Sequence, residues 1–283
     1  MSESNVFETI SREYYDLTAS EKKVADFLMA HQQESQYMSI AELAEECGVA
    51  EATVSRFCRR LGYKGYNAFK LAIANATARM SQQAGRPEEA DSDSLEEAAR
   101  HLSEIDSTAI EQTLSLLSIS AVKAAVDLLE VARCVCCMGQ GGSMLIAAEA
   151  AHLFSSVSEK FFAVSDSHLQ MMRAATMGPE DTVLFFSYSG ATRDMMETLQ
   201  VARESGARII LITRFSKSPG GKFADVLLQC GANESPLQLG SVAAKIAQLF
   251  LLDVLFTEFC RRDPVTCERR RERIATALAD KHL

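Results

Sequence analysis

The sequence lacks a long hydrophobic run. Its 283 residues are 47% hydrophobic and 24% charged, yet no stretch approaches the roughly 18 to 20 uninterrupted apolar residues that a membrane-spanning helix needs. The first residues, Met1-Ser-Glu-Ser-Asn5, also lack the basic start and apolar core of a secretory signal. These absences predict a cytoplasmic protein with no membrane partner, and the length suffices for two domains.

Metal-binding clusters are absent as well. The eight cysteines and five histidines show no Cys/His grouping with the spacing of a zinc site. Cys134, Cys136 and Cys137 fall in an apolar run that is typical of a buried strand. We expect reduced, buried thiols, and the sequence predicts neither a metal nor a cofactor.

Acidic residues are missing from one window, although the net charge of the chain is −9. DNA binding needs a basic face and not a basic protein, so the overall charge does not exclude a nucleic-acid partner. No Asp or Glu occurs from Ala52 to Arg86. The same window holds seven basic residues: Arg56, Arg59, Arg60, Lys64, Lys70, Arg79 and Arg86.

Several short helices are predicted in the first part of the chain, from about Thr18 onward. Thr18-Ala-Ser-Glu21 has the form of a capping box, and Ser39 with Glu42 has the same spacing. Ser39 therefore predicts a helix over 40–47, closed by Gly48, because the residue after a helix often needs positive φ. A further helix is predicted over 51–61.

The segment from Ile40 to Arg59 has the spacing of a helix-turn-helix. Ala44 supplies the small residue where two helices touch, Gly48 supplies the turn, and Val54 and Phe57 fix the second helix. A plain three-helix module with a solvated basic face is the alternative interpretation. In a helix-turn-helix the second helix enters the major groove of double-stranded operator DNA. We expect base or phosphate contacts from Glu51, Thr53, Ser55 and Arg56, and backbone contacts from Arg59, Arg60 and Lys64.

The composition then shifts. Residues 81–94 are polar, with Gly85 and Pro87, and predict a linker. A long helical region follows over 95–131, with a break near 118–120.

From Arg133 onward short apolar runs alternate with amphipathic helices. This alternation predicts a C-terminal α/β domain with a doubly wound, five-stranded parallel sheet, which follows the α-helical N-terminal helix-turn-helix domain. The predicted strands are Cys134–Met138, Phe161–Val164, Val183–Ser187, Ile209–Thr213 and Val226–Gln229. The predicted helices are Ser143–Phe154, His168–Ala175, Thr192–Glu204, Ser241–Phe259 and Thr266–Ala279.

Two loops after predicted strands suit an anion. Gly139-Gln-Gly141-Gly-Ser143 and Ser187-Tyr-Ser189-Gly190-Ala-Thr192 each lead into a helix, whose first N–H groups and positive dipole end favour a phosphate. The first loop does not complete a dinucleotide fingerprint, because Met144 stands where the third glycine belongs. A helix cap and tight turn without a ligand is the alternative interpretation of the second loop.

The chain resembles the RpiR family of transcriptional regulators. The resemblance is carried by Thr18-x-Ser-Glu-Lys-Lys-Val-Ala-Asp-Phe-Leu28, Ser39-Ile-x-Glu-Leu-Ala44 and Ala52-Thr-Val-Ser-Arg-Phe-Cys-Arg-Arg-Leu-Gly-Tyr-Lys-Gly-Tyr-x-x-Phe-Lys70. That family joins this domain to a sugar isomerase (SIS) domain, which the second half of the chain also resembles. The resemblance implies that the loops bind a phosphorylated sugar through Gly141, Ser143, Ser187, Ser189, Gly190 and Thr192. Many relatives have a second serine where this chain has Gly142.

The prediction is therefore a regulator, not an enzyme, that senses a phosphorylated sugar or sugar derivative. It assigns residues 1–80 to DNA binding, 81–94 to the linker and 95–283 to the SIS domain. One alternative is a phosphosugar isomerase, for which Glu234, His168 and His152 could supply a base. We expect Glu234 to contact the sugar and His152 to be a packing residue. Another alternative is a sensor of a non-sugar phosphate or nucleotide. A homodimer or dimer of dimers is expected, with the helices over 95–131 and 266–279 as association surfaces.

Overall fold

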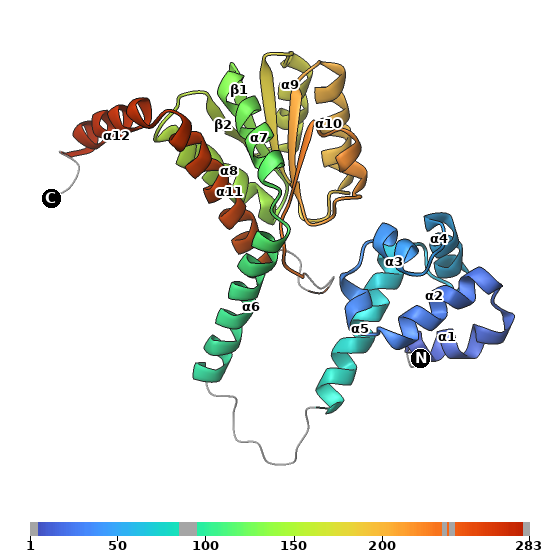
Figure 1. The fold of residues 1–283 in the computed structure, drawn as a ribbon. Coiled ribbons are helices and arrows are strands. Elements are labelled where there is room, and N and C mark those ends of the chain that lie inside the picture. The colour runs from blue at the N-terminus through green and yellow to red at the C-terminus, as the bar shows by residue number, and fades with distance from the viewer. Residues whose placement is uncertain (1–4, 85–94, 234–236, 238–240, 280–283) are drawn as a thin grey trace. The chain divides into compact units, whose positions relative to one another are not determined.

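The computed structural model describes residues 5–84, 95–233, 237 and 241–279. The chain divides into two compact units (Figure 1). Of the described residues, the first unit contains those up to His101 together with Asn233 and Leu237, and the second contains residues 102–232 and 241–279. Each unit is described by itself. Within the described residues, no helix is long and apolar enough to cross a membrane.

The N-terminal unit is α-helical. Thr18 and Ser39 each form the predicted capping box, in which the hydroxyl accepts from the backbone N–H three residues on and the glutamate there accepts from the cap residue. The helices pack around a core that includes Val24, Leu43 and Phe57, all fully buried. The five α-helices are α1 (Val6–Glu13), α2 (Ala19–Ala30), α3 (Ile40–Glu46), α4 (Glu51–Arg60) and α5 (Tyr66–Ala84). The continuation of α5 to Ala84 makes residues 81–84 helical, where the sequence predicts linker.

The C-terminal unit contains the predicted five-stranded parallel sheet, with strand order β2-β1-β3-β4-β5. The predicted fold class is therefore confirmed. The strand predicted over 183–187 is shifted: β3 begins two residues earlier, at Asp181, and ends one residue earlier, at Phe186, so Ser187 begins the loop. The strands are β1 (Cys134–Gly139), β2 (Phe161–Val164), β3 (Asp181–Phe186), β4 (Arg208–Thr213) and β5 (Val226–Gln229).

Helices cover both faces of this sheet (Figure 1). Side chains alternate across a strand, so Leu184 and Phe186 face one layer while Val183 and Phe185 face the other. The first layer contains α7 (Ile119–Val131), α8 (Gly142–Ser155) and α11 (Val242–Arg262). The second contains α9 (Ser167–Thr176) and α10 (Arg193–Glu204).

The long helical region before the sheet is two helices. α6 (Leu95–Ser115) ends before Ser118, whose hydroxyl accepts from the N–H of Ala121 and caps α7. This is the predicted break. The last helix, α12 (Pro264–Leu278), is capped by Asp263 and buries only Cys267.

Candidate DNA-binding and ligand-binding sites

The turn between α3 and α4 has the geometry that the sequence predicts. Gly48 has φ of +60°, a left-handed conformation that favours glycine. The N–H of Val49 donates to the carbonyl of Ala44 at 2.9 Å, which fixes the direction of the chain as it enters α4. Val54 and Phe57 are fully buried, and the Phe57 ring packs edge-on against Phe69 at 5.7 Å between centroids.

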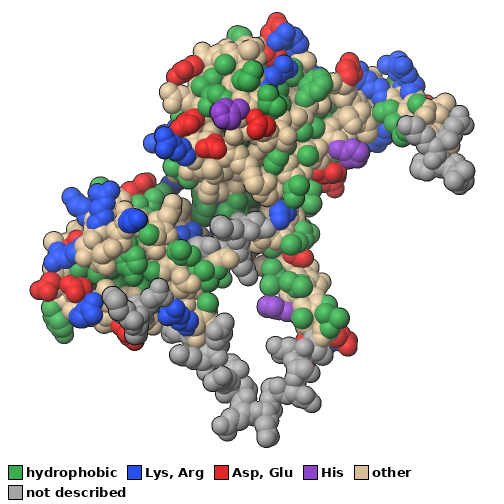
Figure 2. All heavy atoms as spheres, turned by 180° about the vertical axis from the view of Figure 1, so that it is seen from behind, with side chains coloured by type: hydrophobic (Ala, Val, Ile, Leu, Met, Phe, Trp, Pro, Cys, Tyr) green, Lys and Arg blue, Asp and Glu red, His purple; other side chains and the backbone are tan. Residues whose placement is uncertain are grey.

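The outer face of α4 carries charged side chains. Glu51, Arg56 and Arg59 are exposed and Ser55 is half-buried, while Lys64 is exposed just after the helix. Ala50 provides no side-chain cap for α4, so no side chain blocks the helix N-terminus from an acceptor such as a DNA phosphate. The N–H of Thr53 donates to the carbonyl of Ala50 at 2.8 Å. Figure 2 shows Lys and Arg side chains gathered on part of the surface of this unit.

Two predicted DNA contacts lie elsewhere than expected. Thr53 is buried, with 8% of its surface exposed, and its hydroxyl accepts from Arg56 Nη2 at 3.2 Å. Arg60 is bound within the unit, where Nη1 lies 3.3 Å from Glu21 Oε2 and Nη2 donates to the carbonyl of Asp16. Arg60 therefore joins α4 to α2.

The two glycine- and hydroxyl-containing loops lie next to each other. β1 and β3 are neighbours in the sheet, and each loop follows the carboxyl end of one of these strands. The strand order reverses direction between β1 and β3, since the chain leaves β1 toward β2 and returns to β3 on the other side. Open parallel sheets bind ligands in the crevice at such a reversal.

The helices that begin at these loops have no side-chain cap. Gly141 precedes α8 and Thr192 precedes α10, and neither gives a side-chain hydrogen bond to the first turn. By contrast, Ser118, Asp166 and Ser241 cap α7, α9 and α11. No side chain therefore occupies the N-terminus of either helix, which leaves the first turn of α10 to an anion at this edge of the sheet. In α8 the N–H groups of Ser143 and Met144 donate to the carbonyls of Gln140 and Gly141 at 3.1 and 3.2 Å.

The loop after β3 is held in a tight turn. Gly190 has φ of +58°, and its N–H donates to Ser187 Oγ at 3.2 Å. A Cβ at Gly190 would meet the side chain of Ser218 and would lie 2.8 Å from Thr213 Oγ1, so the position requires glycine. Ser187 is buried, whereas Ser189 and Thr192 are exposed.

In the loop after β1, Gly141 is exposed with φ of +55°, and Ser143 is half-buried in the first turn of α8. The structure thus brings the residues of each loop to one edge of the sheet. Glu234 lies outside the described residues.

Sequence reasoning missed two buried polar atoms beside these loops. Gln140 Nε2 and Ser218 Oγ are buried without a hydrogen-bond partner among the described residues. Gln140 belongs to the first loop, and Ser218 lies against Gly190 of the second. A buried polar group without a hydrogen bond lowers the stability of the fold. A hydrogen bond from either atom to a ligand or a water molecule would remove this cost. No pattern in the single sequence distinguishes them from other Gln and Ser residues.

The candidate bases of an isomerase are spread out. His168 is exposed in the first turn of α9, and His152 is exposed near the end of α8. The expectation that His152 packs in the core is therefore wrong. It lies ten residues after Gly142, which at 1.5 Å per residue is roughly 15 Å along the helix from the loop edge.

All eight cysteines are free thiols, and all but half-buried Cys260 are buried. Cys134 and Cys137 have Cys-x-x-Cys spacing, but β1 points them to opposite faces of the sheet. Cys134 instead lies beside Cys136, with 3.8 Å between the sulfurs, and Arg173 Nη2 donates to Cys134 Sγ at 3.1 Å. The contact with Cys136 and the Arg173 guanidinium lower the pKa of Cys134 to about 6, against the opposing effect of burial. Within the described residues, no cluster of His, Cys, Asp or Glu could hold a metal ion.

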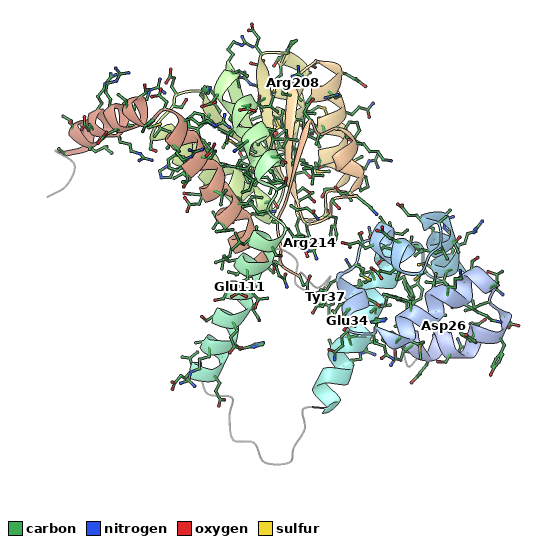
Figure 3. All side chains as sticks on the ribbon, viewed as in Figure 1. Asp26, Glu34, Tyr37, Glu111, Arg208 and Arg214 are labelled. Atoms are coloured by element: carbon green, nitrogen blue, oxygen red, sulfur yellow. The ribbon has the colours of Figure 1, made fainter. Side chains whose placement is uncertain are left out.

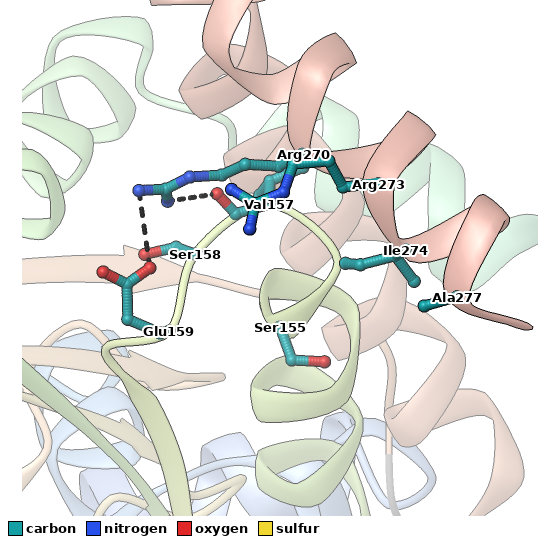
Figure 4. A pocket seen from close by; sticks show the side chains of 8 residues that line it. All are labelled: Ser155, Val157, Ser158, Glu159, Arg270, Arg273, Ile274 and Ala277. Carbon is teal, nitrogen blue, oxygen red and sulfur yellow. Dashed lines mark hydrogen bonds and ion pairs between the residues drawn. The ribbon is translucent and has the colours of Figure 1, made fainter.

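A groove lies at the opposite end of the sheet from these loops, and Figure 4 shows the residues that line it. It has a volume of about 380 Å³ and lies between the residues preceding β2 and α12. Arg270 Nη1 donates to the carbonyl of Val157 at 2.6 Å, and Arg270 Nη2 lies 3.4 Å from Glu159 Oε2. Because Val157 and Glu159 precede β2, the groove is at the amino ends of the strands and does not include the loops after β1 and β3.

Comparison with known proteins agrees with this geometry. Residues 4–80 match the helix-turn-helix domain of the rpiR family, and residues 128–258 match the SIS domain. The transcriptional regulator HexR of Escherichia coli is 30% identical over 98% of this chain and 95% of its own. An HTH-type transcriptional regulator of Haemophilus influenzae is 31% identical over 89% of this chain and 88% of its own.

A similar fold occurs in solved structures. The NanR protein of Vibrio vulnificus, solved in complex with ManNAc-6P, has a TM-score of 0.83, with 23% identity and 98% of each chain covered. The sugar isomerase domain of an RpiR transcription factor from Sphaerobacter thermophilus has a TM-score of 0.58 at 22% identity, covering 63% of this chain and 98% of its own. The chain matches transcriptional regulators along nearly its whole length and has both domains in the same order. It therefore belongs to the rpiR family of helix-turn-helix transcriptional regulators.

Proposed function

We propose that this regulator senses a phosphorylated sugar or sugar derivative in its C-terminal unit and changes its binding to operator DNA in response. The observation that carries the proposal is the pair of uncapped helix N-termini, α8 and α10, that follow neighbouring strands where the strand order reverses. ManNAc-6P bound to the similarly folded NanR supports a sugar phosphate as the ligand class.

The proposal assigns a role to each loop. Ser189 and Thr192, both exposed, donate their hydroxyls to phosphate oxygens, together with the N–H groups at the start of α10. Ser143 and the backbone around Gly141 contact the same ligand from the loop after β1. Ser187 and Gly190 shape the turn, and Glu234 hydrogen-bonds the sugar hydroxyls.

DNA binding is assigned to residues 1–80, joined through 81–94 to effector binding in 95–283. Glu51, Ser55 and Arg56 face the major groove, while Arg59 and Lys64 bind phosphates. The described geometry favours a fold-stabilising role for Thr53 and Arg60 over the direct DNA contacts first expected, because Thr53 is buried and Arg60 is bound to Glu21. The protein acts in the cytoplasm, without a cofactor.

Association of two copies completes the proposal, because operators with two half-sites mirror a two-fold axis. Exposed apolar side chains on α6 and α12 support these helices as association surfaces of a homodimer or dimer of dimers. Leu102 and Leu114 are 60% and 59% exposed on α6, and Val265 is 74% exposed on α12.

The test is a thermal-shift panel of sugar phosphates, including ManNAc-6P, followed by DNA binding with the compound that stabilises the protein. A ligand at 100 times its Kd adds about 2.7 kcal/mol of stability. Ser189→Ala should weaken this response, whereas Ser155→Ala, at the far end of α8, should not. A response unchanged in Ser189→Ala would show that the loop is structural. Conversion of the compound to an isomer would make the protein a phosphosugar isomerase instead.

A further inference from the structure

A chain of hydrogen bonds joins the phosphate loop to the loop after β5. Tyr188, between Ser187 and Ser189, donates its hydroxyl to the carbonyl of Ala232 at 3.1 Å. Arg214, which follows β4 and is labelled in Figure 3, donates Nε to the same carbonyl at 3.2 Å. The Tyr188 ring also packs on a small apolar cluster that contains Ala232.

The loop after β5 is in turn bound to the last turns of α6. The N–H of Gly231 donates to Thr113 Oγ1 at 2.9 Å, and the N–H of Ala232 donates to Gln112 Oε1 at 3.1 Å. A Cβ at Gly231 would lie 2.6 Å from the N atom of Thr113, so the two backbones are in close contact. Gln112 and Thr113 therefore hold this loop against α6.

These turns attach α6 to the C-terminal unit. Ala109 and Thr113 are buried, whereas residues 102–108 are exposed or half-buried. α6 is also the first element after the predicted linker, so the covalent path from the DNA-binding domain enters the C-terminal unit through it. A displacement of the loop after β5 would therefore act on the one helix that leads back toward the DNA-binding domain.

Ala232 gives the connection a strained backbone. Its φ of 109° makes it the non-glycine residue with positive φ in the described chain, a conformation that L-residues adopt only when their surroundings enforce it. Tyr188, Arg214 and Gln112 supply that enforcement through its carbonyl and N–H. Tyr188 is thus one of two side chains that hold the Ala232 carbonyl, and Arg214 is the other.

From these contacts we infer that Tyr188 and Gln112 couple occupancy of the phosphate loop to α6 through the strained backbone of Ala232. This inference rests on the proposed function. A phosphate held by Ser189 and Thr192 reorients the loop that contains Tyr188. The change is transmitted to Ala232 and from there to Gln112 and Thr113, which biases the position of the helix that continues into the linker.

Hydrogen exchange of the full-length protein tests the coupling without a ligand. In Tyr188→Phe we expect the amides of Gly231 and Ala232 and those of 109–115 to exchange at least about fivefold faster. Gln112→Ala should in return speed exchange in 187–192, because coupling is reciprocal. The controls are Tyr15→Phe, at a ring that is 88% exposed in the other unit, and Gln200→Ala, on the exposed face of α10. Unchanged exchange across the connection in both variants would overturn the inference.

A second arm adds inorganic phosphate, which separates this inference from the proposed function. In the wild type, phosphate should slow exchange in 187–192 and alter exchange in 109–115. Tyr188→Phe should keep the first effect and lose the second, whereas an equal response of α6 in both proteins would overturn the coupling. A further outcome is that phosphate and ManNAc-6P both leave the hydrogen exchange of 187–192 unchanged while the variants still show the coupling without a ligand. That result would show that the proposed ligand site is wrong. The coupling would then not transmit occupancy of this loop.

Discussion

Arg60 Nη1 lies 3.3 Å from Glu21 Oε2, which joins the end of α4 to the first turn of α2. Glu21 is also the glutamate of the α2 capping box and accepts from the N–H and hydroxyl of Thr18 at 2.9 and 2.8 Å. Burial alone would raise the pKa of Glu21. The hydrogen bonds from Thr18 and the positive charge of Arg60 outweigh burial and hold this pKa below its usual value. One carboxylate thus fixes both the start of α2 and the placement of α4, the second helix of the helix-turn-helix.

Glu21→Gln should lower the stability of the N-terminal unit by about 1 kcal/mol at pH 7, the typical value of a lost cap. A lowered folded-state pKa stabilises the fold above the unfolded pKa, and this contribution disappears as pH falls through the folded value. The variant and the wild type should therefore converge in urea denaturation below about pH 4. Glu8→Gln, at an exposed position of α1, serves as control. A constant difference between Glu21→Gln and wild type down to pH 2 would contradict this role.

Arg56→Ala should weaken operator binding and reduce the slope of log affinity against log salt by about 1, since one phosphate contact is lost. The matched control is Arg12→Ala, which removes an exposed arginine of α1. Fluorescence anisotropy between about 50 and 200 mM salt measures both quantities. Equal slopes for Arg56→Ala and wild type would remove α4 from the DNA interface.

Gly190→Ala should lower the stability of the C-terminal unit by about 1 to 3 kcal/mol and abolish the ligand-dependent thermal shift. The new Cβ would meet Ser218 and Thr213, and alanine disfavours a φ of +58°. Gly178→Ala is the control, because a Cβ there meets nothing within 4 Å. A normal ligand response in Gly190→Ala would show that the turn does not form the binding site.

Arg173→Met should slow alkylation of Cys134. The contact with Cys136 and the Arg173 guanidinium together lower the pKa of Cys134, so loss of the guanidinium raises this pKa and reduces the reactive thiolate fraction. We expect the rate with iodoacetamide at pH 7, followed by peptide mass spectrometry, to fall at least about tenfold. Arg193→Met, which removes an exposed arginine of α10, is the control. An unchanged rate would show that Arg173 does not stabilise the thiolate.

The elements that the sequence predicts well are those with a local cause. Capping boxes at Thr18 and Ser39, the turn at Gly48 and the apolar runs of the strands depend on residues a few positions apart. The order of the five strands was not predicted, because pairing joins segments such as β1 and β3 that lie more than 40 positions apart. Only that order places the two glycine- and hydroxyl-containing loops on neighbouring strands.

The candidate ligand site also combines features that the sequence predicts with features that depend on the tertiary structure. Ser187 to Thr192 stands out in the sequence because hydroxyls and a glycine fall between a strand and a helix. By itself the sequence determined two domains, their secondary structure and the composition of both candidate sites, since these depend on short-range periodicity and turn chemistry. Tertiary structure alone decided that Thr53 is buried, that Arg60 binds Glu21, and that Tyr188 reaches Ala232 and, through it, α6. Those relationships depend on packing between elements distant in the chain, which no local pattern encodes.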